Sequence, residues 1–423
     1  MQLLLKQVKI IDPTSSNHQQ VKDILIEDGV IQAIRNSITK DVETVKVEGA
    51  CVSPGWMDIG AYVGEPGFEQ DETLETLSAA ASRGGYTSVA VLPNTRPALH
   101  SKSEINFILK NAGDFLTEII PLGAVTRDCA GEDMAELIDM RKSGALAFTD
   151  GKHPIQNAGI LLRAFEYVRT FDGIVLNHPH QSGVSPEGLI HEGPVSVSLG
   201  LRGLPDVMEV MMLKRDIDLL RYSDSRLHVH NISSALCLPI IAAAKEEGLN
   251  VTCSVPALNL EAPVDRIADF NVNYKVLPPL RTEKNRLSLI EALKDGVIDF
   301  VTANHRPVDV ETKKVEFPYA DFGISSLETT FGSITKAFGR NRNLTLIVEA
   351  LAINNRNIFG LDIPSVERGK KAELTIFHSG LSTTYLKQSF GSKSKNNPYL
   401  DQELPGKVLG VINKDRKQLF IPE

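Results

Sequence analysis

A long alternation of apolar runs and amphipathic stretches, from Cys51 to about residue 303, constrains the fold more than any other feature of this chain. The apolar runs have strand length, and most stretches between them carry the period of a helix. Eight strands that alternate with helices predict a (β/α)8 barrel. A doubly wound open sheet is the alternative, because the number of strands does not prove closure. The expected strands are Val52–Ile59, Ser88–Leu92, Glu118–Gly123, Ala145–Thr149, Gly173–Asn177, Arg226–Asn231, Val251–Val255 and Asp299–Ala303.

The two ends of the chain lack this alternation. Residues 1–50 contain short apolar runs separated by turn signals, with no helical period. Residues 360–423 return to the same strand-like pattern. We therefore expect one small β-sandwich built from both termini, flanking a barrel over residues 51–359. The polar stretch from Gly391 to Asn397 predicts a mobile loop.

Charge and cysteine content exclude several classes of partner. The formal net charge is −8, and an acidic chain lacks the basic surface that nucleic acids or anionic membranes attract. The four cysteines form no Cys-x-x-Cys pair, which fits a reducing cytoplasm. No run approaches the roughly 20 apolar residues of a membrane helix, and the N-terminus does not resemble a signal peptide. We therefore expect a cytoplasmic protein with no nucleic acid and no membrane partner.

Nine short motifs are spread over nearly the whole chain. They are Pro54-Gly-Trp-Met-Asp58, Glu65-Pro66-Gly67, Gly84-Gly-Tyr-Thr87, Leu92-Pro-Asn-Thr95, Ala147-Phe-Thr-Asp150, His191-Glu-Gly193, Pro278-Pro-Leu-Arg281, Phe322-Gly-Ile324 and Leu327-Glu-Thr329. In this order they resemble the dihydroorotases of multifunctional complexes, in the amidohydrolase superfamily, and more loosely the hydantoinases. The resemblance implies a (β/α)8 barrel with a composite β-sandwich, in agreement with the periodicity, and a homodimer.

The resemblance also implies zinc chemistry on a cyclic amide. In this family, zinc at the C-terminal mouth of the barrel lowers the pKa of a bound water toward ~7 and polarises the carbonyl. Histidine and carboxylate ligands must converge there from several strand ends. The first strand of the family carries two histidines at positions i and i+2, so that both imidazoles face the mouth.

Four positions of this chain depart from that pattern. Gly60 and Tyr62 occupy the two histidine positions of the first strand. Glycine offers no ligand, and a neutral tyrosine is a poor ligand for zinc. Gly64 stands where the family has the arginine that grips the substrate carboxylate. Asn304 replaces the aspartate that orients the attacking water, and an asparagine cannot accept its proton.

The fourth and fifth strands keep part of the family's ligand set. Asp150 is single where the family has two adjacent aspartates, and His178 retains the fifth-strand histidine. His180 adds a second imidazole on the same face of that strand. These three side chains are the candidates for one zinc ion. The alternative is that the histidines are satisfied pocket residues and that Asp150 holds a loop.

The sixth strand ends in His230-Asn231-Ile232-Ser233-Ser234. Aligning its serines with the family places Asn231 at the ligand position. His228 and His230 then have the opposite strand parity, and we expect them to face outward toward the helices. A slip of one residue would reverse this expectation.

Two further residues are candidates for the substrate pocket. Asn94 is retained where the family contacts the substrate carboxylate, although a loop asparagine bonded to its own backbone is the alternative. His305 follows Asn304 at the end of the eighth strand. Leu277 replaces an asparagine of the family beside the same pocket.

The missing ligands at separated strand ends predict a non-catalytic homologue whose fold serves another purpose. In this family, inactive dihydroorotase-like chains assemble with aspartate transcarbamoylase in pyrimidine biosynthesis, so the resemblance implies that partner and no bound cofactor. The alternative is a metal-dependent cyclic amide hydrolase with a rearranged mononuclear zinc site. An ordinary dihydroorotase is a third hypothesis. Zinc content and dihydroorotase turnover together distinguish the three.

Overall fold

Eight strand positions run parallel to one another in the computed structural model, which describes residues 1–340 and 342–421. Seven are regular strands: β6 (Trp56–Ala61), β7 (Tyr86–Val91), β8 (Glu118–Pro121), β9 (Val175–Asn177), β12 (Leu227–Val229), β13 (Val251–Pro256) and β14 (Phe300–Thr302). One ladder joins β6 to β8, and a second joins β9, β12, β13 and β14. Isolated parallel bridges from Phe148 to Gly123 and to Val175 place the fourth strand between these ladders.

The first and last barrel strands meet at a seam that has no regular ladder. The Tyr62 N–H donates to the His305 carbonyl at 2.7 Å. The buried Asp58 carboxylate accepts the Ala303 N–H, also at 2.7 Å. These contacts join the two ends of the strand series, and the predicted (β/α)8 barrel is confirmed.

Strand residues alternate between two cores. Val89 and Val91 pack in the large core between the strands and the surrounding helices. Their neighbours Ala90 and Leu92 belong to a separate cluster inside the barrel, with Phe300 from the last strand. This period of two explains why the barrel strands are apolar on both faces and appear in the sequence as continuous apolar runs.

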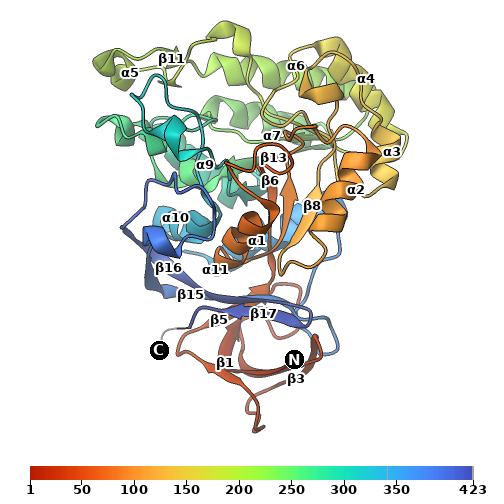
Figure 1. Ribbon diagram of the computed structural model, residues 1–423, viewed down its shortest axis with the longest axis vertical. Coiled ribbons are helices and arrows are strands. Elements are labelled where there is room, and N and C mark those ends of the chain that lie inside the picture. Colours follow the sequence, from red (N-terminus) through yellow and green to blue (C-terminus); the bar gives the residue numbers. More distant parts are fainter. Residues whose placement is uncertain (341, 422–423) are drawn as a thin grey trace.

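Helices cover the outside of the barrel, as Figure 1 shows. Their starts follow capping chemistry: Thr73 accepts from the Thr76 N–H before α1, and Asn157 accepts from two N–H groups before α4. The helices are α1 (Leu74–Arg83), α2 (Lys102–Asn111), α3 (Leu137–Lys142), α4 (Ala158–Arg169), α5 (Pro194–Leu199), α6 (Val207–Ser223), α7 (Leu238–Glu246), α8 (Ala257–Glu261), α9 (Glu283–Lys294), α10 (Thr330–Phe338), α11 (Leu344–Val348) and α12 (Asn354–Phe359). A short pair, β10 (Ile190–His191) and β11 (Gly203–Leu204), precedes α6.

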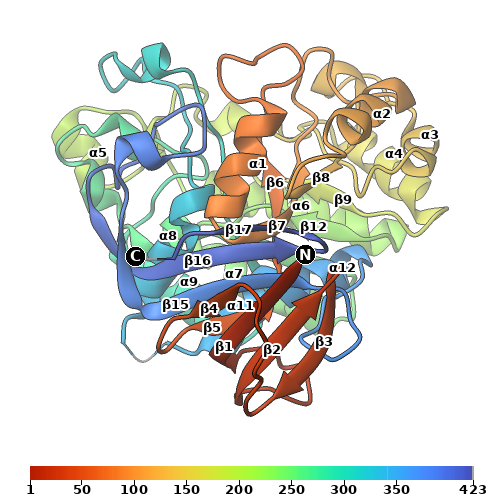
Figure 2. The ribbon, with the colours of Figure 1, turned by 60° about the horizontal axis from the view of Figure 1, so that its bottom comes forward.

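The two ends of the chain form one eight-stranded sheet below the barrel. Figure 2 shows the N-terminal strands (red) beside the C-terminal strands (blue). The order is β17-β16-β15-β5-β1-β2-β3, with β4 beside β1. Leu5, Ile24, Ile376 and Ile412 share its buried core, so both termini are needed to bury it. The strands are β1 (Gln2–Ile10), β2 (Val21–Glu27), β3 (Val30–Arg35), β4 (Thr44–Lys46), β5 (Cys51–Pro54), β15 (Glu373–Thr384), β16 (Glu403–Asn413) and β17 (Arg416–Leu419).

The first strand predicted for the barrel is in fact two strands. The prediction placed Val52–Ile59 in one element, but β5 pairs with β1 and β15, and only β6 pairs with β7. Gly55 separates them, and a Cβ at this position would lie 2.2 Å from Thr87 Oγ1. Cys51–Pro54 therefore belongs by its pairing to the terminal sheet, although the predicted boundary at residue 50 assigned it to the barrel.

The segment Gly391–Asn397, which we call the strap, is not the mobile loop that its composition predicted. Ser392 and Asn397 are each only 1% exposed. The Asn397 amide donates to the Ser325 carbonyl at 2.7 Å, and the Ser325 hydroxyl donates to the Ser394 carbonyl at 2.6 Å. The polar side chains of the strap find partners inside the protein, so polarity here does not indicate exposure.

None of the helices within residues 1–340 and 342–421 combines the length and the apolar character that a bilayer crossing needs.

Candidate functional site

A small cavity lies at the C-terminal mouth of the barrel, where the family resemblance places its chemistry. Its volume is about 40 Å³, which is room for roughly two or three water molecules. Five of the residues selected from the sequence line it: Gly60, His178, Asn231, Asn304 and His305. The alignment therefore identified positions that converge in space, although they lie far apart in the chain.

His228 and His230 were expected to face outward, and this prediction is wrong. Val229 packs in the core between the strands and the helices, so its neighbours on β12 face the barrel interior. The ring of His228 stacks on Phe300 with centroids 4.8 Å apart, and His230 lines the cavity. β12 ends at Val229, so the alternation of the strand does not continue to residues 230 and 231, and His230 and Asn231 both line the cavity.

The imidazole of His230 fills the space above Gly60. A Cβ at position 60 would lie 2.3 Å from His230 Nε2, and Gly60 has a φ of +86°. Both facts restrict this position to glycine. A histidine at position 60 and the present orientation of His230 are therefore mutually exclusive.

Asn231 and Asn304 act as neutral hydrogen-bonding residues at the cavity wall. Asn231 Oδ1 accepts from the hydroxyls of Ser254 and Thr302, each at 2.8 Å. The Asn304 amide donates to the Leu277 carbonyl at 3.2 Å. Neither side chain can accept a proton from water, so the wall holds no general base at these two positions.

His178 has one ring nitrogen without a partner. Its Nδ1 lies 3.1 Å from the His230 carbonyl oxygen, so Nδ1 must carry the hydrogen. Nε2 is buried and has no hydrogen-bond partner within the described residues. Burial, followed by the neighbouring His180 and His230, holds the pKa of His178 well below its usual range. The ring is therefore neutral and directs an acceptor lone pair from Nε2.

His180, Asp150 and Asn94 do not line the cavity. The ring of His180 stacks on His178 with centroids 5.8 Å apart. Asp150 accepts from the Thr126 N–H at 2.9 Å and from its hydroxyl at 2.5 Å, while burial raises the pKa of Asp150 to about 6. The Asn94 amide donates to the Asp150 carbonyl at 2.9 Å. Asp150 thus holds its loop, which was its structural alternative, whereas Asn94 bonds to the loop of Asp150 and Lys152 and not to its own backbone.

Tyr62 lies at the edge of the site and binds Asp71. Its hydroxyl donates to Asp71 Oδ2 at 3.1 Å, and the Nζ of Lys152 lies 3.0 Å from the centroid of its ring. Burial, and then the Asp71 carboxylate, raise the pKa of Tyr62. The phenol therefore stays neutral and is not available as a zinc ligand.

The residues present do not fit the zinc site that the family implies. Zinc sites in proteins hold three or four His, Cys or carboxylate ligands. Within residues 1–340 and 342–421, no three such side chains are close enough to share an ion. Three histidines, His178, His230 and His305, line the cavity, but both ring nitrogens of His305 are bonded to other residues. The predicted set of His178, His180 and Asp150 does not converge. The expectation of a protein without a cofactor stays a prediction for metal analysis.

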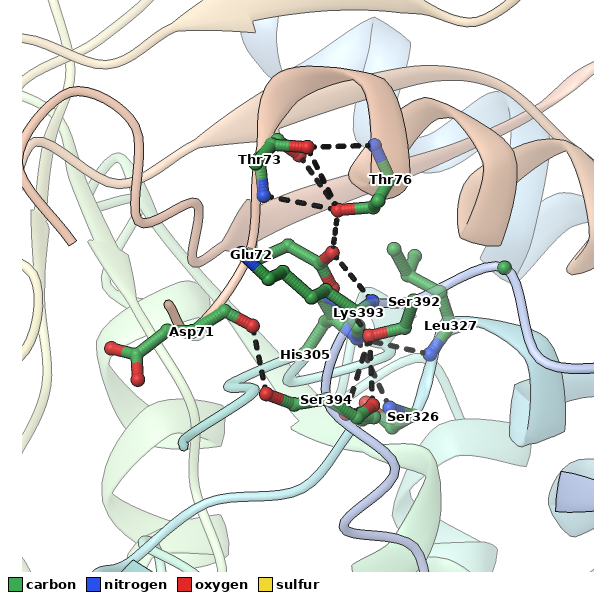
Figure 3. Close-up of polar contacts among 12 residues, drawn as sticks. Asp71, Glu72, Thr73, Thr76, His305, Ser326, Leu327, Ser392, Lys393 and Ser394 are labelled. Carbon is green, nitrogen blue, oxygen red and sulfur yellow. Dashed lines mark hydrogen bonds and ion pairs between the residues drawn. The ribbon is translucent and has the colours of Figure 1, made fainter. Parts of the chain in front are cut away.

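His305 takes part in a buried network that the sequence did not reveal (Figure 3). Its Nδ1 accepts from the N–H groups of Ser326 and Leu327 at 3.1 and 3.4 Å, so Nε2 carries the hydrogen and donates to Glu72 at 3.3 Å. Glu72 is fully buried and also accepts from Ser392 of the strap and from the Lys393 N–H. The His305 ring therefore helps to hold Glu72, the residue that binds the strap. A glutamate just before a helix gave no signal of this role.

Comparisons with known proteins agree with the fold described above. Residues 49–236 match a family model described as dihydro-orotase-like. The chain is 34% identical to a dihydroorotase from Syntrophus aciditrophicus, covering 98% of this chain and 99% of that protein. It is 35% identical to a dihydroorotase from Pelotomaculum thermopropionicum, covering 96% of each. An L-hydantoinase from Arthrobacter aurescens has the same fold, with a TM-score of 0.84 at 21% identity over 99% and 97% of the two chains. The chain therefore belongs to the dihydroorotase family.

Proposed function

We propose that this chain is a dihydroorotase-like protein of pyrimidine biosynthesis that does not catalyse the dihydroorotase reaction and instead assembles with aspartate transcarbamoylase. The observation that carries the proposal is the donor set of the cavity. Two imidazoles, from His178 and His230, and two amides, from Asn231 and Asn304, stand where the reaction needs several metal ligands and a base.

The chemistry explains why this set is insufficient. Opening a cyclic amide at neutral pH requires an activated water and a group that accepts its proton. Asn304 stands at the position of the family's base and cannot accept that proton. Loss of a general base alone costs about 10²–10⁴-fold in rate. Gly60 further removes a ligand position that His230 now fills.

The partner rests on the resemblance to inactive dihydroorotase-like chains. A complete barrel and terminal sheet can support an assembly without chemistry at the mouth. The same resemblance supports a homodimer in the cytoplasm. A net charge of −8 supports the further proposal that neither nucleic acid nor membrane is a partner.

Catalysis is tested on one clean preparation of the full chain. Zinc content is measured by elemental analysis, and ring opening of dihydroorotate and ring closure of carbamoyl aspartate are followed by absorbance. We expect zinc well below one ion per chain and no turnover above the buffer rate. Turnover that disappears in His178→Ala, together with stoichiometric zinc, would refute the inactive assignment. A family dihydroorotase with both first-strand histidines serves as the positive control.

Assembly is tested with the aspartate transcarbamoylase of the same organism. The two purified chains are mixed, and their molar mass is measured by light scattering after size exclusion. We expect one complex whose mass exceeds that of either protein alone, and a dimer of the 46.3 kDa chain when it is measured by itself. Separate elution at micromolar concentrations would refute the partner. An unrelated acidic protein of similar size controls for nonspecific association.

One observation favours a second function, a metal-dependent cyclic amide hydrolase with a mononuclear site. Among residues 1–340 and 342–421, His178 Nε2 has no partner; it lies beside His230, and such a nitrogen is a good zinc ligand. Zinc titration followed by calorimetry decides this case. Tight binding that is lost in both His178→Ala and His230→Ala, with hydrolysis of a cyclic amide or imide, would support it. Because His180 and Asp150 point elsewhere, Asp150→Asn should leave the zinc affinity unchanged.

A further inference from the structure

We propose that the cavity at the barrel mouth binds a small oxyanion that carries one proton, of the bicarbonate class, between Lys152 and Arg306. The inference goes beyond the proposed function and holds with or without a partner protein. Two basic residues, Lys152 and Arg306, line the cavity, and no carboxylate lines it within the described part of the chain.

Arg306 brings a cation to the cavity, and the carboxylates of Asp321 and Asp71 lie near enough to act on its charge. Its backbone is fixed, because its N–H donates to the Ile324 carbonyl at 2.8 Å. Its Nε is buried and has no hydrogen-bond partner within residues 1–340 and 342–421. A guanidinium does not deprotonate in a protein, so this Nε is a charged donor that has no acceptor among those residues. Such groups usually have a partner, often a ligand.

Lys152 lines the same cavity from the loop that follows Asp150. Its N–H donates to Asn94 Oδ1 at 2.8 Å. Gly151 has a φ of +59°, and a Cβ there would lie 2.0 Å from that same oxygen. These contacts restrict the conformation of the loop, in which Lys152 Nζ lies over the ring of Tyr62. Burial, and then the positive charge of Arg306, hold the pKa of Lys152 well below its usual range. An anion between the two cations would relieve this repulsion.

The nearby carboxylates do not supply that anion. Asp71 and Asp321 act on the charge of Lys152, but neither lines the cavity. Both oxygens of Asp71 are occupied, one by the Tyr62 hydroxyl and the other by the Asp309 N–H at 2.8 Å. The two cations therefore face a space that no carboxylate of the described residues lines.

The remaining polar group selects the ligand. His178 Nε2 is an acceptor, so the ligand must offer a hydrogen as well as negative oxygens. A volume of about 40 Å³ suits an ion of a few atoms. Bicarbonate meets both conditions, because its carboxylate oxygens suit the two cations and its O–H suits the imidazole.

The test is calorimetric titration of the full chain, treated with a chelator to remove any metal. Sodium bicarbonate, formate and chloride are compared at matched ionic strength. We expect saturable millimolar or tighter binding of bicarbonate, weaker binding of formate because it has no O–H, and no saturation with chloride. Absence of saturable bicarbonate binding, or equal binding of chloride, would overturn the proposal. Formate that binds as tightly as bicarbonate would overturn the role of His178.

Two variants locate the ion. Arg306→Gln and Lys152→Gln should each weaken bicarbonate about tenfold, the loss expected for one charge-assisted hydrogen bond. Lys314→Gln, which changes an exposed lysine paired with Glu311, should leave the affinity unchanged. Circular dichroism and urea unfolding establish that each variant is folded. If both cavity variants are folded and retain full affinity, the ion binds elsewhere and the site is wrong. This outcome is independent of the transcarbamoylase and turnover assays.

Discussion

Asn304 and His305 are neighbours on one loop, yet they serve two regions that differ in how completely polar groups are satisfied. Asn304 faces the cavity, where His178 Nε2 and Arg306 Nε have no partner in the described residues. His305 faces the strap, where both ring nitrogens and the Glu72 carboxylate are bonded. Polar groups without partners indicate a surface kept for a ligand, and complete pairing indicates a structural role.

The two regions also differ in their effect on the stability of the protein. A buried donor or acceptor without a partner costs roughly 1–3 kcal/mol, so the cavity wall lowers the stability of the protein. The strap network stabilises the fold near the seam, because Glu72 links α1, the loop after β14 and the C-terminal segment by hydrogen bonds. Changes in the strap should therefore reduce the free energy of unfolding, whereas changes at the mouth should mainly alter binding.

The largest expected effect is that of Glu72→Gln. The carboxylate is fully buried and accepts from Thr76, Ser392, Lys393 and His305, and an amide would turn a donor toward some of these donors. We expect a loss of about 3–5 kcal/mol in the free energy of unfolding, measured in urea.

The control for this variant is Glu75→Gln, an exposed change in the first turn of the same helix. It should cost less than about 0.5 kcal/mol. If the two variants are equally stable, the strap network does not stabilise the seam.

The second effect depends on pH and tests Asp58 at the seam. Burial raises the pKa of Asp58 to about 7 in the folded protein, against about 4 when it is unfolded. The folded state therefore holds this proton longer, and the associated stability is lost as the pH rises through about 7. Relative to wild type, Asp58→Asn should gain about 3 kcal/mol in the free energy of unfolding between pH 5 and pH 8.

Parallel urea titrations at the two pH values measure this difference. A wild-type-minus-variant difference that is independent of pH would show that Asp58 is already ionised at pH 5. Glu75→Gln again serves as the matched control, because an exposed carboxylate should give the same difference at both pH values.

The third effect tests whether His230 has taken the space at position 60. Gly60→Ala combines a positive φ with a Cβ 2.3 Å from His230 Nε2, so it should cost about 2–3 kcal/mol. Adding His230→Ala should recover the steric part, about 1–2 kcal/mol, and leave the backbone part. Strictly additive losses in the unfolding titrations would contradict the contact.

The smallest expected effect is that of a substitution at the exposed edge of the strap. Lys393→Gln changes an exposed side chain whose backbone N–H still donates to Glu72. We expect less than about 0.5 kcal/mol of change in the free energy of unfolding. A larger loss would move part of the stabilisation from the buried groups of the strap to its surface charge.

Periodicity and motif order predicted the barrel and several positions of the site, because both depend on local patterns. Gly60, His178 and Asn304 were found in this way and do meet at one cavity. Register was harder: the sixth strand is short, and β12 covers only Leu227–Val229, so alternation gave too few residues to fix parity.

The remaining errors have tertiary causes. Gly55 divides an apolar run into two strands of different sheets, and nothing in the run itself marks the division. The strap is polar and would suit a loop, but Glu72 and Ser325 supply buried partners from distant parts of the sequence. The sequence pattern did not predict Lys152 and Arg306 as site residues, because the family pattern indicates metal ligands and basic side chains are not among them.

The strap has a consequence for how the protein is made. Ser392 binds Glu72 across 320 positions of sequence, and β15 and β16 complete a sheet that β1 begins. During synthesis, Glu72 and the first helix of the barrel leave the ribosome long before the strap, whose Ser392 and Lys393 donate hydrogen bonds to the Glu72 carboxylate. The contacts between Glu72 and the strap therefore form only when the last tenth of the chain is present, and a message cut short near residue 390 would release a protein that lacks them.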